Sequence, residues 1–258
     1  MKRIAIIGIG TGDPDHVTVQ AVKVLNEVDV FFLVDKGRDT ESLVDVRREI
    51  CARHITARSY RFVEIPDAPR DRAAAAYTAA VEDWHDERAV RYARALETEL
   101  RDGERGAFLV WGDPGLYDST LRIIGEIARR RDVDLDVEVV PGISSVQALA
   151  ARHRVPLNRI GESVHITTGR NLRAGWPDGV DNVVVMLDGE CSFATIEHAE
   201  SFDIYWGAYL GTEHEVLRAG NLGEVSDDIQ HVRRAARDSH GWIMDTYLLR
   251  RRRAEDTR

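Results

Sequence analysis

The chain has 258 residues and an acidic balance of charge, with 35 Lys and Arg against 44 Asp and Glu. A chain of this length is near the size at which one hydrophobic core divides, so we expect two compact domains. The negative charge argues against a general nucleic-acid-binding protein, because phosphate contacts need a basic face.

Cysteine usage and hydropathy exclude two further classes of protein. The two cysteines, Cys51 and Cys191, lie far apart and lack CxxC spacing, which argues against a redox or zinc motif. No stretch reaches the ~18 to 20 consecutive apolar residues of a membrane span. We therefore expect a cytoplasmic protein that has no membrane partner.

The N-terminal segment predicts a strand, a turn and a helix. Residues 3–7 form an apolar run that ends in glycines, and apolar positions recur at helical spacing between Val17 and Val28. Asp13 is a favourable N-cap, and Pro14 suits the first helical position. Residues 30–34 predict a second buried strand.

The same pattern returns twice. Residues 107–111 predict a strand, followed by Gly112-Asp113-Pro114 and an apolar helical stripe from Leu116 to Ile127. Residues 137–140 predict another strand, followed by the turn 141–145 and a further helix. Three such junctions indicate an α/β fold with mainly parallel strands, in which ligands bind beyond the carboxyl ends of the strands.

The remaining segments predict smaller elements. Residues 68–102 predict one or two amphipathic helices that cover the sheet. After Pro156, strands are expected at 165–168, 183–187, 204–209 and 242–249, and a short helix at 193–199. We place the domain boundary near residue 140, which gives an N-terminal α/β domain at 1–140 and a C-terminal α/β domain at 141–258.

The glycine-rich turn from Gly8 to Asp13 permits a close approach of the backbone to a ligand. The dinucleotide fingerprint GxGxxG would need glycine at position 13, where Asp13 would face a pyrophosphate. A nicotinamide-dependent oxidoreductase therefore remains an alternative of lower weight. Each of the three turns, taken alone, is also explained as a capped turn without a ligand.

Taken together and in this order, the turns at 8–13, 112–117 and 141–145 resemble those of the tetrapyrrole methylase family. The resemblance continues through 155–157, 184–188 and Gly211-Thr212. Thr11 stands where this family usually has proline. Thr11, Trp111 and the segment 187–193 are similar to the family's deacetylating precorrin-6A synthase branch.

This resemblance implies a fold of two α/β domains with S-adenosylmethionine bound in the cleft between them, and a homodimer. Tyr117 would support the adenosyl group or line the substrate trough, although a buried tyrosine with a satisfied hydroxyl explains it equally well. The resemblance assigns these residues to the cofactor: Thr11, Trp111, Gly112, Asp113, Leu116, Tyr117, Ser144, Ser145, Leu187 and Gly211.

The branch resemblance further implies methylation of precorrin-5 at C1 with release of acetate, giving precorrin-6A. Another precorrin methyltransferase and a non-catalytic tetrapyrrole carrier remain alternatives. Acetate release requires a base or an oxyanion donor, and Asp13, Asp188 and His165 are the candidates. The nine histidines show no HExxH motif, so we expect no metal site.

A tetrapyrrole carries many carboxylates, so the substrate requires local cations despite the acidic total. The basic residues between 36 and 61 form a first candidate set, although a solvated helix face explains them equally well. Arg170 and Arg173 form a second candidate set. The first set comprises Lys36, Arg38, Arg47, Arg48, Arg53, Arg58 and Arg61.

Overall fold

A computed structural model describes residues 1–35, 41–56, 58–68 and 77–253, with the side chains at 35, 41–42 and 77–83 left out of the description. The chain forms two compact units, Met1–Ser144 and Ser145–Arg258, which are described separately below. The division falls a few residues after the position expected from the sequence.

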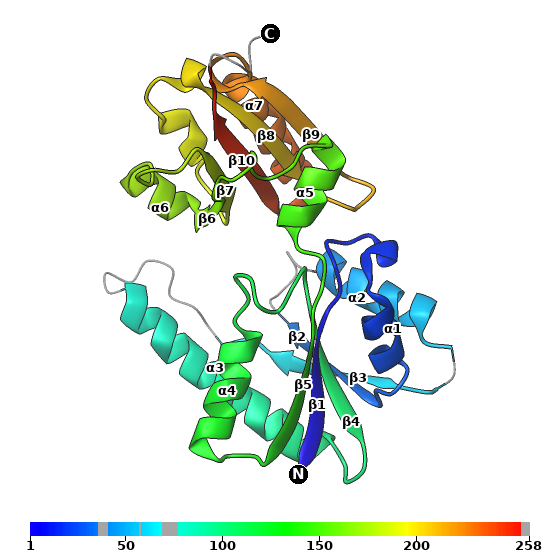
Figure 1. The fold of residues 1–258 in the computed structure, drawn as a ribbon. Helices are drawn as coiled ribbons and strands as arrows, with labels where there is room; N and C mark the ends of the chain where they lie inside the picture. The colour runs from blue at the N-terminus through cyan, green and yellow to red at the C-terminus, as the bar shows by residue number, and fades with distance from the viewer. Residues whose placement is uncertain (36–40, 57, 69–76, 254–258) are drawn as a thin grey trace. The chain divides into compact units, whose positions relative to one another are not determined.

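The first unit contains a five-stranded parallel sheet (Figure 1), as the three junctions predicted. The edge strand β3 was not predicted, because Arg61 and Glu64 interrupt its apolar pattern. The strand order is β3 (Arg61–Pro66), β2 (Val30–Asp35), β4 (Arg105–Val110), β1 (Lys2–Gly8) and β5 (Leu135–Val140).

Helices cover both faces of this sheet (Figure 1): α1 (Val19–Leu25) and α2 (Glu41–His54) lie on one face, and α3 (Tyr77–Glu99) and α4 (Thr120–Arg130) on the other. Strand β1 is consequently buried on both sides, as is typical of parallel sheets. Its Ile7 packs in the core beneath α1 and α2.

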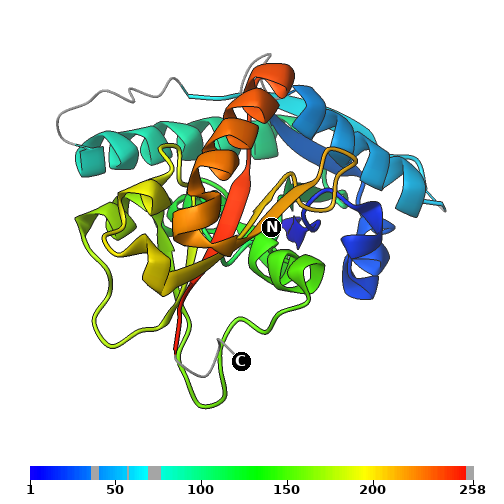
Figure 2. The ribbon, with the colours of Figure 1, turned by 90° about the horizontal axis from the view of Figure 1, so that it is seen from above.

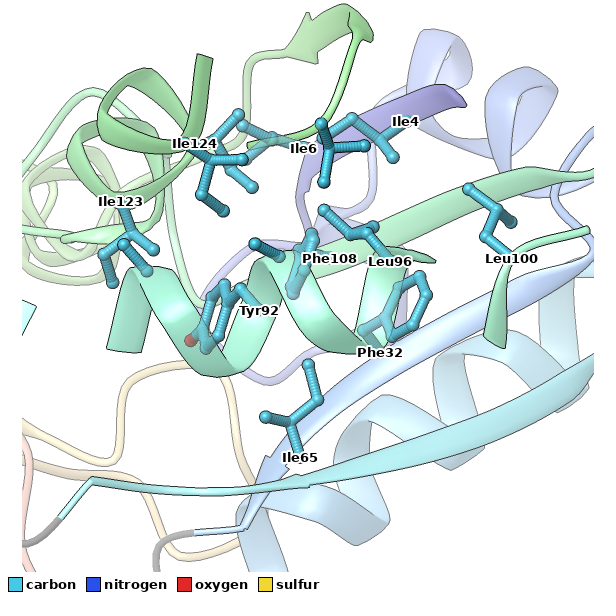
Figure 3. Close-up of a cluster of buried hydrophobic side chains, with 14 of the residues drawn as sticks. Ile4, Ile6, Phe32, Ile65, Tyr92, Leu96, Leu100, Phe108, Ile123 and Ile124 are labelled. Carbon is cyan, nitrogen blue, oxygen red and sulfur yellow. The ribbon is translucent and has the colours of Figure 1, made fainter. Parts of the chain in front are cut away.

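The core on the other face of the sheet joins residues distant in the chain. Ile4 and Ile6 of β1 belong to it together with side chains from α3 and α4. Figure 3 shows Leu96 and Tyr92 of α3 near Phe108 of β4. The rings of Tyr92 and Phe108 stack with centroids 5.0 Å apart. This packing holds the strands of the first sheet in place, and the candidate site is built at their carboxyl ends.

Two predicted helix starts were wrong. Asp13 caps only a short 3₁₀ turn at Pro14–His16, and α1 begins at Val19, where the Thr18 hydroxyl accepts a hydrogen bond from the Ala21 amide at 3.1 Å. Helix α4 begins at Thr120 and not after Pro114. The chain between Pro114 and Thr120 includes Tyr117 at a φ of 52°, which is incompatible with a continuous α-helix.

The second unit contains a mixed sheet in which β6 and β7 are parallel and the other pairs are antiparallel. The C-terminal strand is the central one, because it pairs with both β7 and β8. The order is β6 (His165–Thr168), β7 (Asn182–Met186), β10 (Asp245–Arg251), β8 (Phe202–Ala208) and β9 (Val216–Asn221).

Helix α7 (Leu222–His240) lies along this second sheet (Figure 2), and its Leu222 and Ile229 are buried with Trp206 of β8. Two shorter helices, α5 (Ser145–His153) and α6 (Gly169–Ala174), complete the unit. The helix predicted at 193–199 was wrong, because that segment forms 3₁₀ turns at Ser192–Thr195 and Ala199–Ser201.

Candidate functional site

The first unit brings together the turns that follow β1, β4 and β5, as expected for the carboxyl edge of a parallel sheet. Gly10 and Gly112 form an isolated β-bridge, in which the Gly112 amide donates to the Gly10 carbonyl at 2.7 Å. The returning bond, from the Gly10 amide to the Gly112 carbonyl, measures 3.4 Å. Backbone hydrogen bonds therefore join the first two turns.

Asp113 connects the second turn to the third. Its Oδ1 accepts a hydrogen bond from the Gly115 amide at 2.8 Å, and its Oδ2 accepts one from the Gly142 amide at 2.9 Å. The sequence had suggested that this carboxylate caps the following helix, but it does not cap α4. It fixes the distance between two turns that lie 29 residues apart.

The glycines at this edge allow the backbones to approach closely. A Cβ atom on Gly142 would lie 2.1 Å from the Gly112 carbonyl oxygen, and a Cβ on Gly8 would lie 2.6 Å from the Gly142 nitrogen. Gly112 differs from these two, since its φ of 68° favours glycine while the nearest atom to its Cβ position is 3.6 Å away. Backbone contact excludes side chains at Gly8 and Gly142, whereas conformation disfavours them at Gly112.

Polar and aromatic side chains surround this glycine cluster. Thr11 and Ser144 are buried, with 2% and 3% of their surfaces exposed, and Trp111 and Leu116 are half-buried. Tyr117 is 44% exposed, so the alternative of a buried structural tyrosine is wrong. Partial burial nevertheless raises the pKa of its phenol. Seven of the ten residues expected at the cofactor thus lie in this unit, on the turns that follow its strands.

A histidine that the sequence analysis did not single out completes the first turn. The Nδ1 of His16 lies 3.2 Å from the Thr11 hydroxyl, and its Nε2 lies 3.8 Å from Oδ2 of Asp13. The Asp13 Oδ1 accepts a hydrogen bond from the Asp15 amide at 2.8 Å. The spacing from Asp13 to His16 was the available signal, because residues three apart in a single helical turn face each other.

In the second unit, Asp188 is a buried carboxylate that accepts four hydrogen bonds. Oδ2 accepts from the Tyr247 hydroxyl and the Ser192 amide, both at 2.6 Å. Oδ1 accepts from the Ser192 hydroxyl at 2.8 Å and the Glu190 amide at 3.2 Å. Burial and the nearby carboxylate raise the pKa of Tyr247, which therefore remains a donor. This geometry favours a structural role for Asp188.

The other second-unit candidates lie at four different places. Leu187 is 66% exposed at a φ of 54°, directly after β7. The Gly211 amide donates to Oε2 of Glu215 at 2.9 Å, and the Ser145 hydroxyl accepts from that of Thr246 at 2.9 Å. His165 is exposed on the edge strand β6. None of these residues is described with as many side-chain hydrogen bonds as Asp188.

Most of the candidate cations for substrate carboxylates are occupied. Lys36 and Arg38 lie outside the described residues, and Arg173 is paired with Glu190. Four other arginines of the set have carboxylate partners, in the pairs Arg48–Glu64, Arg53–Asp15, Arg58–Asp29 and Arg61–Glu104.

Arg47 differs from these four. Its Nε donates to the Leu109 carbonyl at 3.1 Å and its Nη1 to the Leu43 carbonyl at 2.7 Å, and no carboxylate of the described residues lies within ion-pair distance. Burial lowers the pKa of its guanidinium, with Asp118 opposing that shift. Arginine nonetheless stays protonated in proteins, so this is a largely buried cation.

Arg47 lines a pocket of about 80 Å³ at the carboxyl ends of β2 and β4. Arg88, which also lines it, is bound to Asp67 through Nε at 2.6 Å and to the Ser119 hydroxyl through Nη1 at 3.1 Å. Asp118 is a third charged lining residue, and its Oδ1 accepts from the Thr120 amide. The described lining thus combines two arginines, one carboxylate and apolar side chains.

Over the described ranges, no three His, Cys, Asp or Glu side chains gather closely enough to hold a metal ion. Nor does the described part of the chain contain a helix that is both long and apolar enough to span a bilayer.

Comparison with known proteins gives consistent matches over nearly the whole chain. Residues 3–226 match the family model described as tetrapyrrole (corrin/porphyrin) methylases. A precorrin-6A synthase (deacetylating) from Sinorhizobium sp. is 49% identical over 251 residues, which cover 97% of this chain and 96% of that protein.

Solved structures match as well. The crystal structure of a putative cobalamin synthesis related protein (CobF) from Corynebacterium diphtheriae has a TM-score of 0.83 at 40% identity, covering 97% of this chain and 99% of that one. Uroporphyrin-III C-methyltransferase from Thermus thermophilus, complexed with S-adenosylhomocysteine, has a TM-score of 0.56 at 20% identity, with 96% of each chain covered. The latter likeness concerns the fold alone.

Proposed function

The chain belongs to the tetrapyrrole (corrin/porphyrin) methylase family, and we propose that it methylates precorrin-5 at C1 with release of acetate, giving precorrin-6A. The observation that carries this proposal is the identity of 49% to the Sinorhizobium enzyme along almost its full length. The presence of Thr11 and Trp111 at the turns supports the same branch.

We propose S-adenosylmethionine as the methyl donor, since it supplies an electrophilic methyl group that needs no further activation. The glycine cluster fits such a ligand, because Gly8, Gly112 and Gly142 keep side chains away from the strand ends. The buried hydroxyls of Thr11 and Ser144 and the half-buried Trp111 offer polar and stacking contacts. Ser145, Leu187 and Gly211 of the second unit remain part of the proposed donor site.

The protein contributes mainly position to the methyl transfer. Holding the ring carbon in line with the methyl group lowers the activation barrier by several kcal/mol, up to ~7 to 11 kcal/mol in ideal intramolecular cases. Among the described arginines of the 36–61 set, Arg47 is the one whose guanidinium bonds only to carbonyls, so we propose that it receives a substrate carboxylate. The small volume of its pocket admits a carboxylate arm while the macrocycle stays outside.

Acetate release requires water to attack a carbonyl carbon. Of the three candidates for a base, Asp188 has both carboxylate oxygens occupied by donors, and His165 lies exposed on an edge strand. Asp13 lies on the first turn beside Thr11 and retains a solvent-facing oxygen near His16. We therefore propose the Asp13 turn as the place of the hydrolytic chemistry.

The test is incubation of the purified protein with precorrin-5 and S-adenosylmethionine, followed by mass spectrometry of the macrocycle and assay of free acetate. The proposal requires one added methyl, a lost acetyl group and one acetate per turnover. A methylated product that keeps its acetyl group would identify another precorrin methyltransferase. Calorimetry with S-adenosylhomocysteine and NADH separates the remaining alternatives, since an oxidoreductase binds NADH and a carrier binds neither.

We further propose that the protein acts as a homodimer in the cytoplasm. The dimer is supported by the family resemblance, and the cytoplasmic setting by the two separated cysteines without CxxC spacing. Light scattering coupled to size-exclusion chromatography measures the mass in solution. A mass corresponding to one chain at micromolar concentration would contradict the dimer.

A further inference from the structure

The cluster of Thr11, Asp13 and His16 combines a hydroxyl, a carboxylate and an imidazole on one turn. The imidazole lies between the other two groups, with Nδ1 at 3.2 Å from the Thr11 hydroxyl and Nε2 at 3.8 Å from the Asp13 carboxylate. The Thr11 side chain is buried, whereas 27% of His16 and 39% of Asp13 remain exposed. The cluster is thus anchored at one end and accessible to water at the other.

The local backbone is built to hold His16 in this position. A Cβ atom on Gly10 would lie 2.7 Å from the Cβ of His16, so only glycine leaves room for the histidine over the turn. The His16 amide also donates to the Asp13 carbonyl at 2.9 Å. These contacts fix the ring by its backbone as well as by its Nδ1.

The neighbouring charges leave the Asp13 carboxylate available to His16. Arg53 of α2 is paired with Asp15 at 2.5 Å. His54 is bonded through Nε2 to the Pro14 carbonyl at 2.9 Å. Asp13 therefore has His16 as its described ion-pair partner.

Thr11 is also the position at which this chain departs from the family resemblance, where proline is usual. Proline has no hydroxyl and could not bind the His16 ring. The residue that replaces this proline therefore contacts His16, a group that can act as a general acid or base. The proposed reaction differs from simple methylation by a hydrolysis, which needs such a group. We infer that His16 is the general base for acetate release, oriented by Thr11 and assisted by Asp13; this inference rests on the proposed function.

The geometry assigns a role to each atom. In the proposed tautomer the Nδ1–H of His16 donates a hydrogen bond to the Thr11 hydroxyl oxygen, which leaves Nε2 unprotonated, and the Asp13 carboxylate stabilises the imidazolium that forms. A water oxygen bonds to the acetyl carbonyl carbon while its proton passes to Nε2. The bond between that carbon and the macrocycle then breaks and acetic acid leaves. The electron pair of that bond enters the conjugated ring, which takes up the proton from His16, so that the neutral imidazole is restored. The methyl group would be supplied separately by the donor when it is bound.

The decisive variant is His16→Gln, compared with His231→Gln on the exposed face of α7 as the matched control. With precorrin-5 and S-adenosylmethionine, we expect acetate release to fall about 100-fold or more in His16→Gln, as for loss of a general base. The affinity for S-adenosylhomocysteine should stay within about threefold of the parent, because most expected cofactor contacts are elsewhere. Added imidazole should restore part of the acetate release in His16→Gly.

A measurement without substrate or donor tests the orientation of the ring. Nitrogen NMR of the ligand-free protein, with the His16 signal identified by its loss in His16→Gln, should show the proton on Nδ1. Thr11→Val should shift the ring towards the other tautomer and lower acetate release about tenfold. If His16 were only structural, imidazole would not restore acetate release in His16→Gly. The His16→Gln variant would then melt at a lower temperature, and Thr11→Val would leave the tautomer of the ring unchanged.

The outcomes separate this inference from the proposed function. If the unmodified protein forms neither the methylated product nor acetate, both are overturned. If it forms both and a folded His16→Gln variant releases acetate at the parent rate, only the role of His16 is overturned. Should His16→Gln fail to fold, Asp13→Asn and Thr11→Val decide, since undiminished acetate release by both would likewise overturn it.

Discussion

The carboxylate of Asp113 accepts a hydrogen bond from the Gly142 amide at 2.9 Å and thereby joins the turns that follow β4 and β5. The same side chain also holds the Gly115 amide through its other oxygen. One residue thus sets the shape of two of the three turns at the candidate site.

We expect Asp113→Asn to weaken both folding and ligand binding. Asparagine offers one acceptor oxygen, so either the Gly115 or the Gly142 amide would face an NH₂ group. Loss of one such bond costs about 1–3 kcal/mol, and the affinity for S-adenosylhomocysteine should fall about tenfold. Chemical denaturation and calorimetry measure the two effects.

The control for this variant is Asp136→Asn, an exposed position on β5 that should change neither quantity. An unchanged affinity in a destabilised Asp113→Asn protein would mean that these turns do not bind the ligand.

Glycine substitutions should have opposite effects at two positions of the first unit. Gly142→Ala would place a Cβ atom 2.1 Å from the Gly112 carbonyl oxygen, so we expect a loss of about 3 kcal/mol or more in the free energy of unfolding. Gly125 lies in α4 with no atom within 4 Å of its Cβ position. Gly125→Ala should therefore stabilise the protein by about 0.5–1 kcal/mol.

Denaturant titrations of both variants provide the comparison. If Gly142→Ala changed the free energy of unfolding by the same amount as Gly125→Ala, the backbone around Gly142 would be able to relax without cost.

The parallel first sheet was predictable because its strands repeat one local pattern. Three of the four predicted strands, at 3–7, 107–111 and 137–140, are short runs rich in apolar residues that are followed directly by glycine or proline. Burial on both faces makes the apolar pattern of the inner strands continuous. The edge strand β3 escaped prediction for the complementary reason, since Arg61 and Glu64 reach solvent and neighbouring charges.

The helix starts and the partners of the site residues were not predictable, because they depend on contacts between turns. Asp113 has the sequence signature of an N-cap, yet its oxygens bind the Gly115 and Gly142 amides. The role of Asp188 was equally hidden, since its partner Tyr247 lies 59 residues away. Local pattern therefore predicted that these turns follow strands, whereas tertiary hydrogen bonds decide which groups their side chains bind.

Acid should weaken the contact between Arg61 and Glu104. The Arg61 guanidinium donates to both carboxylate oxygens at 2.7 and 2.8 Å, and these hydrogen bonds lower the pKa of Glu104 to about 2. A carboxylate with a depressed pKa contributes stability that is complete above its ordinary value of 4.5 and lost as the pH falls through about 2.

Glu104→Gln should remove this contribution, which we expect to be about 0.5–1 kcal/mol because the pair is partly exposed. The difference in unfolding free energy between parent and variant should therefore be present at pH 6 and shrink towards pH 2. Glu97→Gln, at an exposed position of α3, is the control. A difference that grows as the pH falls would contradict the sign of this argument.

Arg47→Gln should separate a substrate-binding role from a structural one. The guanidinium is bonded to the Leu43 and Leu109 carbonyls, so its loss will also destabilise the link between α2 and β4. A cation that additionally receives a substrate carboxylate contributes about 1.5–3 kcal/mol to binding, equivalent to a KM about 10- to 100-fold higher for precorrin-5 in the variant. The affinity for S-adenosylhomocysteine should not change.

The neighbouring Arg48→Gln is a matched control, because Arg48 is exposed and paired with Glu64 at 3.1 Å. It should leave KM unchanged. Arg47→Lys keeps the charge but loses the planar fork of donors, and we expect a KM between those of the parent and of Arg47→Gln. A fall in melting temperature with an unaltered KM would show that Arg47 only fastens α2 to the sheet. The substrate carboxylates would then have to be bound by other cations, of which Arg170 on α6 is the first to test.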